Sequence, residues 1–436
     1  MLPRVLVVTY YFPPAGGPGV QRTLKTVRYL RETGFEPVVL TVEDGAFPAT
    51  DPGLVADVPE GVRVVRTRAP DPLRLYGRLT GKGEVPTGAV STAGWAARLA
   101  LWIRANVFVP DARVGWVPFA KLAGRRVIGQ SLRIAEPVAA VVTSGPPHSV
   151  HLVGRRLQRM GVPWVADFRD PWTAINFYDD LPMSGPARKL DAWLERRVLR
   201  GADAVTTVSP TWARHLENRG GIQRGSVTVV HNGVDHADLG AADDVAVRGD
   251  AFVLAHVGSL YATRNPTAVW EAVRRLRQAG EIDRLAVRLV GTTDPDVLQA
   301  AEATGAPVEA VPYVTHAEAV REQARAGALL LSIEPFSADR GMITGKLYEY
   351  LASVRPVLGV GPPDGDAAAL LAETGGGDLF ARDDVDGVAE WLRRHYAAWD
   401  AGTPHAGAAW DAVAPYTRLA QTETLAGVIR QLNEDR

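Results

Sequence analysis

Short apolar runs alternate with helical stretches along the whole chain, and this alternation restricts the possible folds more than any other feature of the sequence. It is the pattern of parallel βαβ units. A first series of runs predicts strands at 4–11, 37–43, 63–68, 138–144, 163–168, 204–208 and 227–231, and a second series predicts strands at 252–258, 285–290, 308–314, 328–333, 356–360 and 377–381. We therefore expect an α/β protein with two Rossmann-like, doubly wound parallel sheets that face each other across a cleft.

The domain limits follow from the place where the two series meet. A chain of 436 residues is too long for one compact core. The first series ends near residue 235, which predicts an N-terminal domain at 1–235 and a C-terminal domain at 236–409. No strand is predicted at about 71–130, so this segment is interpreted as a helical insertion in the N-terminal domain. Residues 410–436 are expected to form a helix that packs back on the N-terminal domain.

Composition excludes several classes of protein. The formal net charge is -1, so no basic field attracts nucleic acid. The chain has no cysteine, which excludes a disulfide framework, a thiolate nucleophile and a cysteine metal site, and fits a reducing cytoplasm. The first residues lack the pattern of a signal peptide, and no apolar run reaches the roughly 18 residues of a membrane span. We expect a cytoplasmic protein.

Residues 94–109 combine apolar bulk with two arginines and no acid. We interpret this segment first as a helix packed against the first sheet, and a peripheral contact with the inner face of a membrane is the alternative. The sequence leaves both interpretations open.

A glycine-rich loop follows the first predicted strand. Gly16 and Gly17 allow the backbone to approach a phosphate or a sugar closely before a helix begins. The spacing Gly17-x-Gly19-x-x-Arg22 departs from the dinucleotide fingerprint, whose third position must be small where helix meets strand. A stiff turn without a ligand is the alternative. The position of the loop at the carboxyl edge of the sheet favours binding.

Polar loops also follow the fourth and fifth predicted strands. The first loop carries His148 and His151, and the second carries Asp170. The carboxyl ends of adjacent parallel strands lie at one edge of a sheet, so these side chains should converge on one crevice. Helix caps and turn residues are the alternative interpretation. His148, His151 and Asp170 are therefore our catalytic candidates.

In the second half, a predicted helix begins with an unusual cation. Thr344 is expected to cap this helix, whose free amides near Gly345 form an anion site. Lys346 lies in the first turn, where the helix dipole favours acids instead. A bound diphosphate would supply the compensating charge. Glu349 follows one turn later on about the same side of the helix.

Together these motifs resemble the GT-B glycosyltransferases of family 4, which are retaining enzymes, and the resemblance covers essentially the whole chain. The matching stretches are the Gly-Gly loop, Val-x-x-Val-His-Asn-Gly-Val-Asp at 227–235 and Gly-Lys-Leu-Tyr-Glu-Tyr-Leu-Ala at 345–352. The resemblance implies a GT-B fold and the transfer of a sugar from a nucleotide-diphosphate donor to an acceptor hydroxyl.

The resemblance also implies donor contacts. In that family the glycine-rich loop lies against the donor phosphates and sugar, and a basic pair neutralises the diphosphate. The lysine position of this pair matches Arg264, whereas its arginine position holds Ser259. Two glutamates seven residues apart bind the donor sugar and the ribose. The second matches Glu349, but the first falls on Gly341, so Glu334 or Asp339 would have to substitute for it.

The donor-binding candidates are thus Gly16, Gly17, Ser259, Arg264, Glu334, Asp339, Gly345, Lys346 and Glu349. No metal cofactor is expected, because Arg264, Lys346 and the amides near 344–346 would neutralise the leaving diphosphate. Asp294 and Asp296 are interpreted as a helix cap and first turn rather than as metal ligands.

The expected partners are a UDP-, GDP- or dTDP-sugar and a glycan, lipid-linked or small-molecule acceptor. Two alternatives remain open. One is a GT-B nucleotide-sugar epimerase. The other is a non-catalytic sugar-nucleotide-binding partner subunit, which the missing acid at Gly341 would suit.

Overall fold

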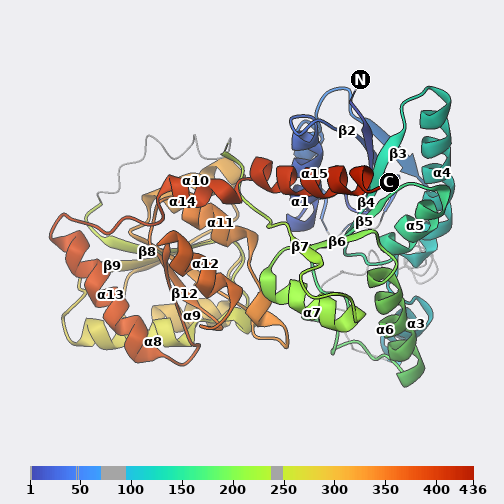
Figure 1. Ribbon diagram of the computed structural model, residues 1–436. Coiled ribbons are helices and arrows are strands. Elements are labelled where there is room, and N and C mark those ends of the chain that lie inside the picture. Colours follow the sequence, from blue (N-terminus) through green and yellow to red (C-terminus); the bar gives the residue numbers. More distant parts are fainter. Residues whose placement is uncertain (1, 46, 48, 70–94, 237–248) are drawn as a thin grey trace. The chain divides into compact units, whose positions relative to one another are not determined.

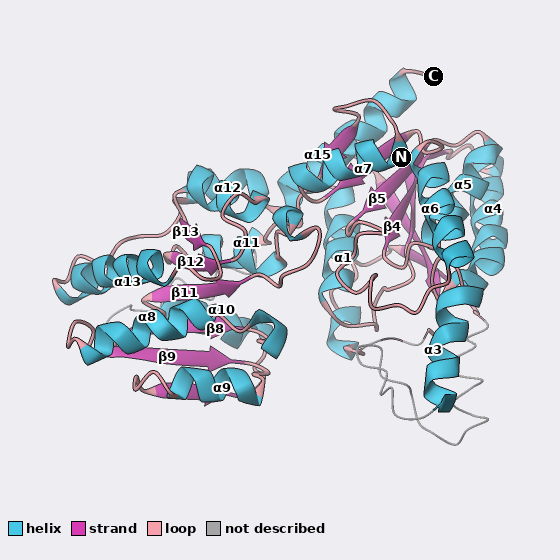
Figure 2. Cartoon of the chain, turned by 90° about the horizontal axis from the view of Figure 1, so that it is seen from below, coloured by secondary structure: helices cyan, strands magenta, loops and turns pink. Residues whose placement is uncertain are grey.

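The computed structural model describes residues 2–45, 47, 49–69, 95–236 and 249–436 (Figure 1). The chain divides into two compact units. Unit 1 comprises the residues up to His231 together with Gln421–Arg436, and unit 2 comprises Asn232–Ala420. Each unit is built around one parallel β-sheet flanked by helices, as Figure 2 shows.

The sheet of unit 1 has seven strands in the order β3-β2-β1-β4-β5-β6-β7. They are β1 (Arg4–Val8), β2 (Glu36–Val42), β3 (Arg63–Thr67), β4 (Val138–Gly145), β5 (Trp164–Phe168), β6 (Ala204–Thr207) and β7 (Val227–Val229). In β1, Leu6 and Val8 belong to one core cluster, and Val5 and Val7 to another, as the two-residue period of a strand requires. Both faces of the sheet are therefore covered, which explains the continuous apolar runs.

The helices described in unit 1 are α1 (Pro18–Leu30), α3 (Trp95–Val107), α4 (Val117–Arg133), α5 (Val150–Leu157), α6 (Gly185–Leu199), α7 (Pro210–Gly220) and the greater part of α15 (Arg418–Glu434). In α1, Val20, Leu24 and Val27 recur at the spacing of an amphipathic helix and enter the core. Leu425 and Ile429 of α15 belong to the same core cluster, so the end of the chain completes unit 1.

The sheet of unit 2 has six strands in the order β10-β9-β8-β11-β12-β13. They are β8 (Phe252–Val257), β9 (Leu285–Val290), β10 (Val308–Val311), β11 (Ala328–Ser332), β12 (Val357–Val360) and β13 (Gly377–Phe380). The helices described are α8 (Thr267–Gln278), α9 (Pro295–Glu302), α10 (His316–Arg325), α11 (Gly345–Ala352), α12 (Asp366–Thr374), α13 (Val385–Asp400) and α14 (Trp410–Val413). Separate core clusters lie against α8 and α13 and against α11 and α12.

The predicted α/β fold class with two Rossmann-like sheets is confirmed, and every predicted strand is present. Two strands end earlier than expected. β1 ends at Val8, although the apolar run continues, because Tyr10 and Phe12 are buried from a loop instead. β10 likewise ends at Val311. An apolar run marks burial, and burial does not require a strand.

The predicted insertion at 71–130 is described only from residue 95 onward, where it contains α3 and most of α4. Residues 70–94 and 237–248 lie outside the described residues. None of the helices in the described ranges is both long and apolar enough to span a bilayer.

Candidate active site

The glycine-rich loop joins β1 to α1 in unit 1. Gly17 directly precedes the helix and has φ +98°, a conformation that residues with side chains rarely adopt. Gly16 donates its N–H to the carbonyl of Ala49 at 2.9 Å. A Cβ on Gly19 would lie 2.6 Å from Nη1 of Arg169, so a larger residue at this position would displace the guanidinium. Backbone conformation and close packing therefore fix the loop.

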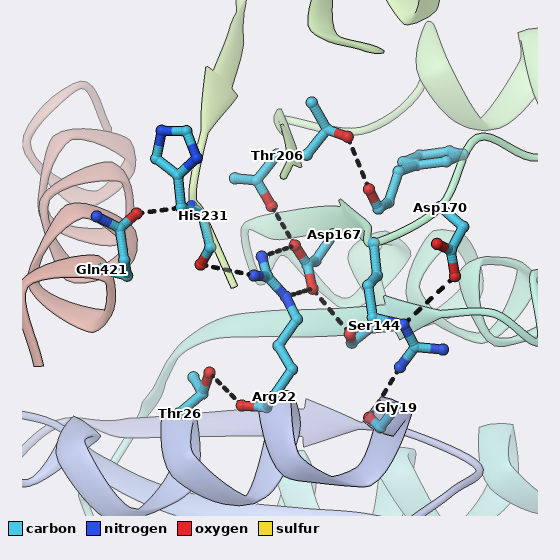
Figure 3. A network of polar contacts seen from close by, with 12 residues as sticks. Gly19, Arg22, Thr26, Ser144, Asp167, Asp170, Thr206, His231 and Gln421 are labelled. Atoms are coloured by element: carbon cyan, nitrogen blue, oxygen red, sulfur yellow. Dashed lines mark hydrogen bonds and ion pairs between the residues drawn. The ribbon is translucent and has the colours of Figure 1, made fainter. Parts of the chain in front are cut away.

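Arg22, which breaks the dinucleotide fingerprint, forms a buried ion pair with Asp167 at the end of β5 (Figure 3). Its Nη2 and Nε donate to the two carboxylate oxygens at 2.8 and 3.2 Å. The hydroxyls of Ser144 and Thr206 donate to the same carboxylate at 2.7 and 2.8 Å. Arg22 Nη1 donates to the carbonyl of His231 at 2.9 Å.

This network stabilises the site rather than carrying chemistry. Burial by itself would raise the pKa of Asp167, but the charge of Arg22 and the hydrogen bonds of Arg22, Ser144 and Thr206 outweigh it and lower the pKa. The pair is thus ionised at neutral pH. It connects α1 to β4, β5 and β6, and it holds the start of α1 against the carboxyl edge of the sheet (Figure 3).

His148 and His151 stack with the aromatic rings of Phe168, which ends β5, and of Trp172, which lies in the loop after it. The His148 and Trp172 ring centroids are 5.1 Å apart with planes 6° apart, and those of His151 and Phe168 are 4.4 Å apart. Both histidines are buried. His151 Nδ1 lies 2.9 Å from the hydroxyl oxygen of Thr143. The loops after β4 and β5 thus form one aromatic cluster.

Three buried nitrogens of this cluster, His148 Nδ1, His148 Nε2 and His151 Nε2, make no hydrogen bond within the described part of the chain. A Cβ on Gly145 would lie 2.8 Å from His151 Nε2 and 3.3 Å from His148 Nδ1, so a glycine lets both rings approach. Burial lowers the pKa of His151 to about 3, and it also lowers the pKa of His148 well below its usual value. The neutral rings can orient a ligand hydroxyl, but they do not act as imidazolium acids at pH 7.

Asp170 lies at the same edge of the sheet and pairs with Arg169. Its Oδ2 is 3.4 Å from Nε of Arg169, and its side chain is 29% exposed. Arg169 donates to the carbonyl of Gly19 at 2.8 Å, and its charge contributes to the low pKa of His148. The structure therefore groups the two histidines together and pairs Asp170 with Arg169.

In unit 2, Lys346 extends from the first turn of α11 to the end of β8. Its Nζ lies 3.3 Å from Nε2 of His256 and 3.3 Å from the carbonyl oxygen of Ser259. A Cβ on Gly258 would collide with the Lys346 side chain, so this glycine makes room for the cation. Burial, with the charge of Arg264 second, lowers the pKa of Lys346 to about 8.

His256 contacts this lysine, and its position within the apolar strand β8 hides it from a prediction based on motifs. Its Nδ1 is 2.9 Å from the carbonyl oxygen of Leu330. A carbonyl only accepts, so Nδ1 carries the proton and Nε2 accepts a hydrogen bond from Lys346. Burial, with the charge of Lys346 second, lowers the pKa of His256 to about 3, so the ring is neutral. The one sequence feature that could have indicated a role for His256 is that it is a polar residue in an otherwise apolar strand.

Arg264 ends a 3-10 turn that follows β8. Ser332 of β11 donates its hydroxyl to the Arg264 carbonyl at 2.7 Å. The guanidinium lies 5.5 Å from the ring centroid of Tyr261, and Nε lies 3.7 Å from Oε2 of Glu334. Its charge lowers the pKa of Lys346. Arg264 and Lys346 therefore form one positive locus, and Glu334 lies beside it.

The remaining donor candidates divide into two groups. Glu349 is half-buried, accepts from Gln323 Nε2 at 3.3 Å and raises the pKa of Lys346, so it belongs to the positive locus. Asp339 instead accepts from Arg382 Nη2 at 2.7 Å. Of the two substitutes considered for the missing glutamate, Glu334 lies beside Arg264, whereas Asp339 pairs with Arg382.

Thr344 is the N-cap residue of α11, as predicted, but its side chain makes no capping hydrogen bond. The residue has the extended backbone of a cap, and its hydroxyl is buried without a partner among the described residues. The amides of Gly345 and Lys346 are therefore not occupied by this hydroxyl. Asp294 does cap α9, as predicted, by accepting from the N–H of Asp296 at 3.1 Å.

The residues that the structure describes contain no group of three His, Asp or Glu side chains placed to hold a metal ion. Ser259 contributes its carbonyl to Lys346. The candidates of unit 1 thus lie at one sheet edge around buried histidines, and those of unit 2 lie around two cations.

The sequence model of the glycosyl transferase 4-like domain matches residues 16–233, which is half of the chain. No curated protein matches the sequence.

Three solved structures share the fold over nearly the whole length. A glycosyltransferase from Rickettsia africae has a TM-score of 0.64 at 10% identity, covering 100% of both chains. Sucrose-phosphate synthase from Thermosynechococcus elongatus has a TM-score of 0.62 at 15% identity, also covering 100% of both. Anabaena HepE in complex with UDP and glucose has a TM-score of 0.52 at 13% identity, covering 99% of this chain and 98% of the other. The two sheets and their flanking helices match the two-domain α/β GT-B fold.

Proposed function

The chain belongs to the glycosyl transferase 4-like family and is a glycosyltransferase, and we propose that it is a retaining, metal-independent enzyme with a nucleotide-diphosphate sugar as donor. One observation carries the proposal: Arg264 and Lys346 form a positive locus beside the free amides at the start of α11. Such a locus suits a diphosphate. The HepE complex with UDP and glucose supports the same class of donor.

On the donor side, Arg264, Lys346 and the amide of Gly345 neutralise the diphosphate. Glu349 accepts hydrogen bonds from the ribose hydroxyls. Glu334 takes the place of the missing sugar-binding acid, because it lies next to Arg264. Asp339 is a weaker choice, since its carboxylate pairs with Arg382 and not with a residue of the positive locus.

On the acceptor side, the buried nitrogens of His148 and His151 orient the acceptor hydroxyl or the reacting sugar. Asp170 and its partner Arg169 border this edge. The glycine-rich loop at Gly16 and Gly17 allows the close approach of the donor phosphates and sugar. Since both histidines are neutral at pH 7, their role is orientation rather than proton donation.

The reaction balances without a protein nucleophile. The bond between the anomeric carbon and the diphosphate oxygen breaks, and the acceptor oxygen bonds to the same face of the anomeric carbon. The acceptor proton passes to the departing diphosphate oxygen. Arg264 and Lys346 stabilise the charge on the diphosphate as it leaves, which is the part that a metal ion plays in other enzymes.

We also infer a cytoplasmic protein with a peripheral membrane contact. The absence of cysteine supports the first inference. The second is supported by α3, which exposes Trp95, Leu99, Trp102, Ile103 and Val107.

Incubation with UDP-, GDP- and dTDP-sugars and a panel of glycan, lipid-linked and small-molecule acceptors tests the function. We expect one donor to yield free nucleoside diphosphate and a glycoside with the anomeric configuration of the donor, detected by proton NMR. An inverted product would overturn the retaining mechanism.

The same experiment separates the alternatives. An epimerase would equilibrate the donor sugar without any acceptor. A non-catalytic partner subunit would bind the donor without turnover on any acceptor of the panel.

A further inference from the structure

The helix α3 has two different faces. Trp95, Leu99, Trp102 and Ile103 are 79%, 48%, 48% and 38% exposed, and they recur at the spacing of one helical stripe, which Val107, 64% exposed, extends at the end of the helix. Large apolar side chains gathered on one exposed stripe mark an interaction surface, whereas single exposed ones do not. We call Trp95, Leu99, Trp102, Ile103 and Val107 the apolar stripe.

The helix α3 and its neighbour α6 carry exposed positive charge and no exposed carboxylate. The sequence of α3 contains no Asp or Glu. The two acids of α6, Asp191 and Glu195, are buried. The exposed cations of these two helices are Arg98, Lys189 and Arg197. An apolar stripe bordered by cations complements an anionic lipid surface.

The helices α3 and α6 are joined directly. The side-chain oxygen of Asn106 accepts from the N–H of Ser184 at 2.6 Å, and its amide nitrogen donates to the carbonyl of Pro182 at 2.9 Å. Figure 2 shows α3 beside the start of α6. The outer face of α6 adds Trp193, which is 46% exposed and stacks under the guanidinium of Arg197 at 4.8 Å.

The other side of α3 presents Arg104 to the polar edge of the sheet. Arg104 makes no hydrogen bond or ion pair to the described residues, and its charge interacts with those of Arg113 and Asp111. The carboxylate of Asp111 is already hydrogen-bonded, because it accepts from the N–H and the hydroxyl of Ser149 at 2.8 Å each. Ser149 directly follows His148. Arg104 is therefore a cation without an ion pair among the described residues, and the carboxylate with which its charge interacts is already occupied, next to the histidine cluster.

We propose that the acceptor is a phosphate-bearing lipid, whose chain lies in a membrane at the apolar stripe and whose phosphate is bound by Arg104. This rests on the proposed function and narrows its acceptor from three classes to one. One helix then joins the membrane surface to the residues that orient the acceptor. A soluble glycan would use neither the stripe nor the unpaired guanidinium.

Two probes test the proposal. The first is sedimentation with vesicles of phosphatidylcholine alone or mixed with phosphatidylglycerol. We expect the protein to bind the mixed vesicles, and the triple variant Trp95→Ser, Leu99→Ser, Trp102→Ser to bind at least roughly 10²-fold more weakly, because three apolar side chains leave the lipid. The control is Tyr313→Ser, which changes an aromatic residue of unit 2 that is 85% exposed.

The second probe is calorimetric titration with short-chain phosphatidic acid, short-chain phosphatidylcholine and inorganic phosphate. Phosphatidic acid should bind best, and Arg104→Gln should weaken it roughly tenfold or more, as expected for a charge-assisted contact. The exposed Arg98→Gln should affect vesicle binding but not this titration. If inorganic phosphate bound as tightly as phosphatidic acid, the site would be one for free anions, and the proposal of a lipid acceptor would be wrong.

Nucleoside diphosphate binding, measured on the same samples, distinguishes a failure of the acceptor assignment from a failure of the proposed function. If nucleotide binds and neither vesicles nor phosphatidic acid do, the acceptor assignment fails alone. If no nucleotide binds, the proposed function fails. A dimer that the triple serine variant abolishes, without vesicle binding, would assign the stripe to a second copy of the chain and contradict the proposal.

Discussion

Lys346 makes the donor site sensitive to pH. Burial and the charge of Arg264 lower its pKa to about 8, and a bound diphosphate favours the charged form. Nucleoside diphosphate affinity should therefore fall as pH rises above about 8, by up to about tenfold per pH unit, because free Lys346 is then neutral. The Lys346→Gln variant should bind more weakly and lose this slope. Calorimetry on either side of the pKa checks it, with the exposed Lys189→Gln as control. An unchanged slope in Lys346→Gln would place the titrating group elsewhere.

Glu349 should contribute to nucleotide binding as such. We expect Glu349→Ala to weaken nucleoside diphosphate and nucleotide sugar alike, by about 1.5 to 3 kcal/mol, because the lost contact is a charge-assisted hydrogen bond to the ribose. The circular dichroism spectrum should be unchanged. The exposed Glu302→Ala of α9 is the matched control. Normal donor binding together with weakened acceptor binding would contradict the assigned orientation of the donor.

Variants of the two histidines test whether these residues orient the acceptor or the reacting sugar. His148→Phe and His151→Phe keep the aromatic stacking but remove the ring nitrogens, so they should lower turnover by about 10²-fold while nucleotide affinity stays nearly intact. Asp170→Asn tests the third candidate in the same way. If these residues only shape the loops, stability should fall by about 1 kcal/mol and turnover per folded molecule should persist. Melting temperature and turnover, measured on each variant, decide between the two.

At the scale of elements, the Arg22–Asp167 pair is the connection that we expect to be most sensitive. Asp167→Asn leaves a buried guanidinium without its counter-charge, which should destabilise the protein by roughly 3 to 5 kcal/mol. Thr206→Val removes one hydrogen bond from the same carboxylate and should cost about 1 kcal/mol. Urea unfolding measures both.

The pH dependence provides a second test of this pair. The pKa of Asp167 is lowered in the folded state, so its contribution to stability is present above the unfolded pKa and is lost as pH falls through the folded pKa. The Asp167→Asn variant should lose that part of the acid sensitivity. Equal acid sensitivity in variant and wild type would contradict the ionised pair.

The strands were predictable because β-branched and apolar runs bounded by turn residues carry their own signal. Side-chain contacts of the site were less predictable. Thr344 fits a cap by residue type, yet its hydroxyl does not cap. Arg22 finds its partner 145 residues away, and His256 reads as one residue of a core strand. Such pairings arise when loops of separate βα units come together at a sheet edge, so sequence spacing does not reveal them.

At the scale of the whole molecule, two sheets of the same design carry different chemistry. The edge of unit 1 holds neutral buried histidines, whereas that of unit 2 holds Arg264 and Lys346. The proposed division into an acceptor side and a donor side is based on this contrast in charge. It agrees with the family to which the chain belongs, whose sequence model matches residues 16–233.

The central claim is that unit 2 binds a nucleotide-diphosphate sugar through Arg264 and Lys346 without a metal. The direct test is thermal unfolding in EDTA with UDP-, GDP- and dTDP-sugars, for the wild type and for Arg264→Gln, Lys346→Gln. We expect one donor, at about 100 times its Kd, to stabilise the wild type by roughly 2.7 kcal/mol and the double variant by far less. Stabilisation only after Mg²⁺ or Mn²⁺ is added, or equal stabilisation of the double variant, would contradict the account.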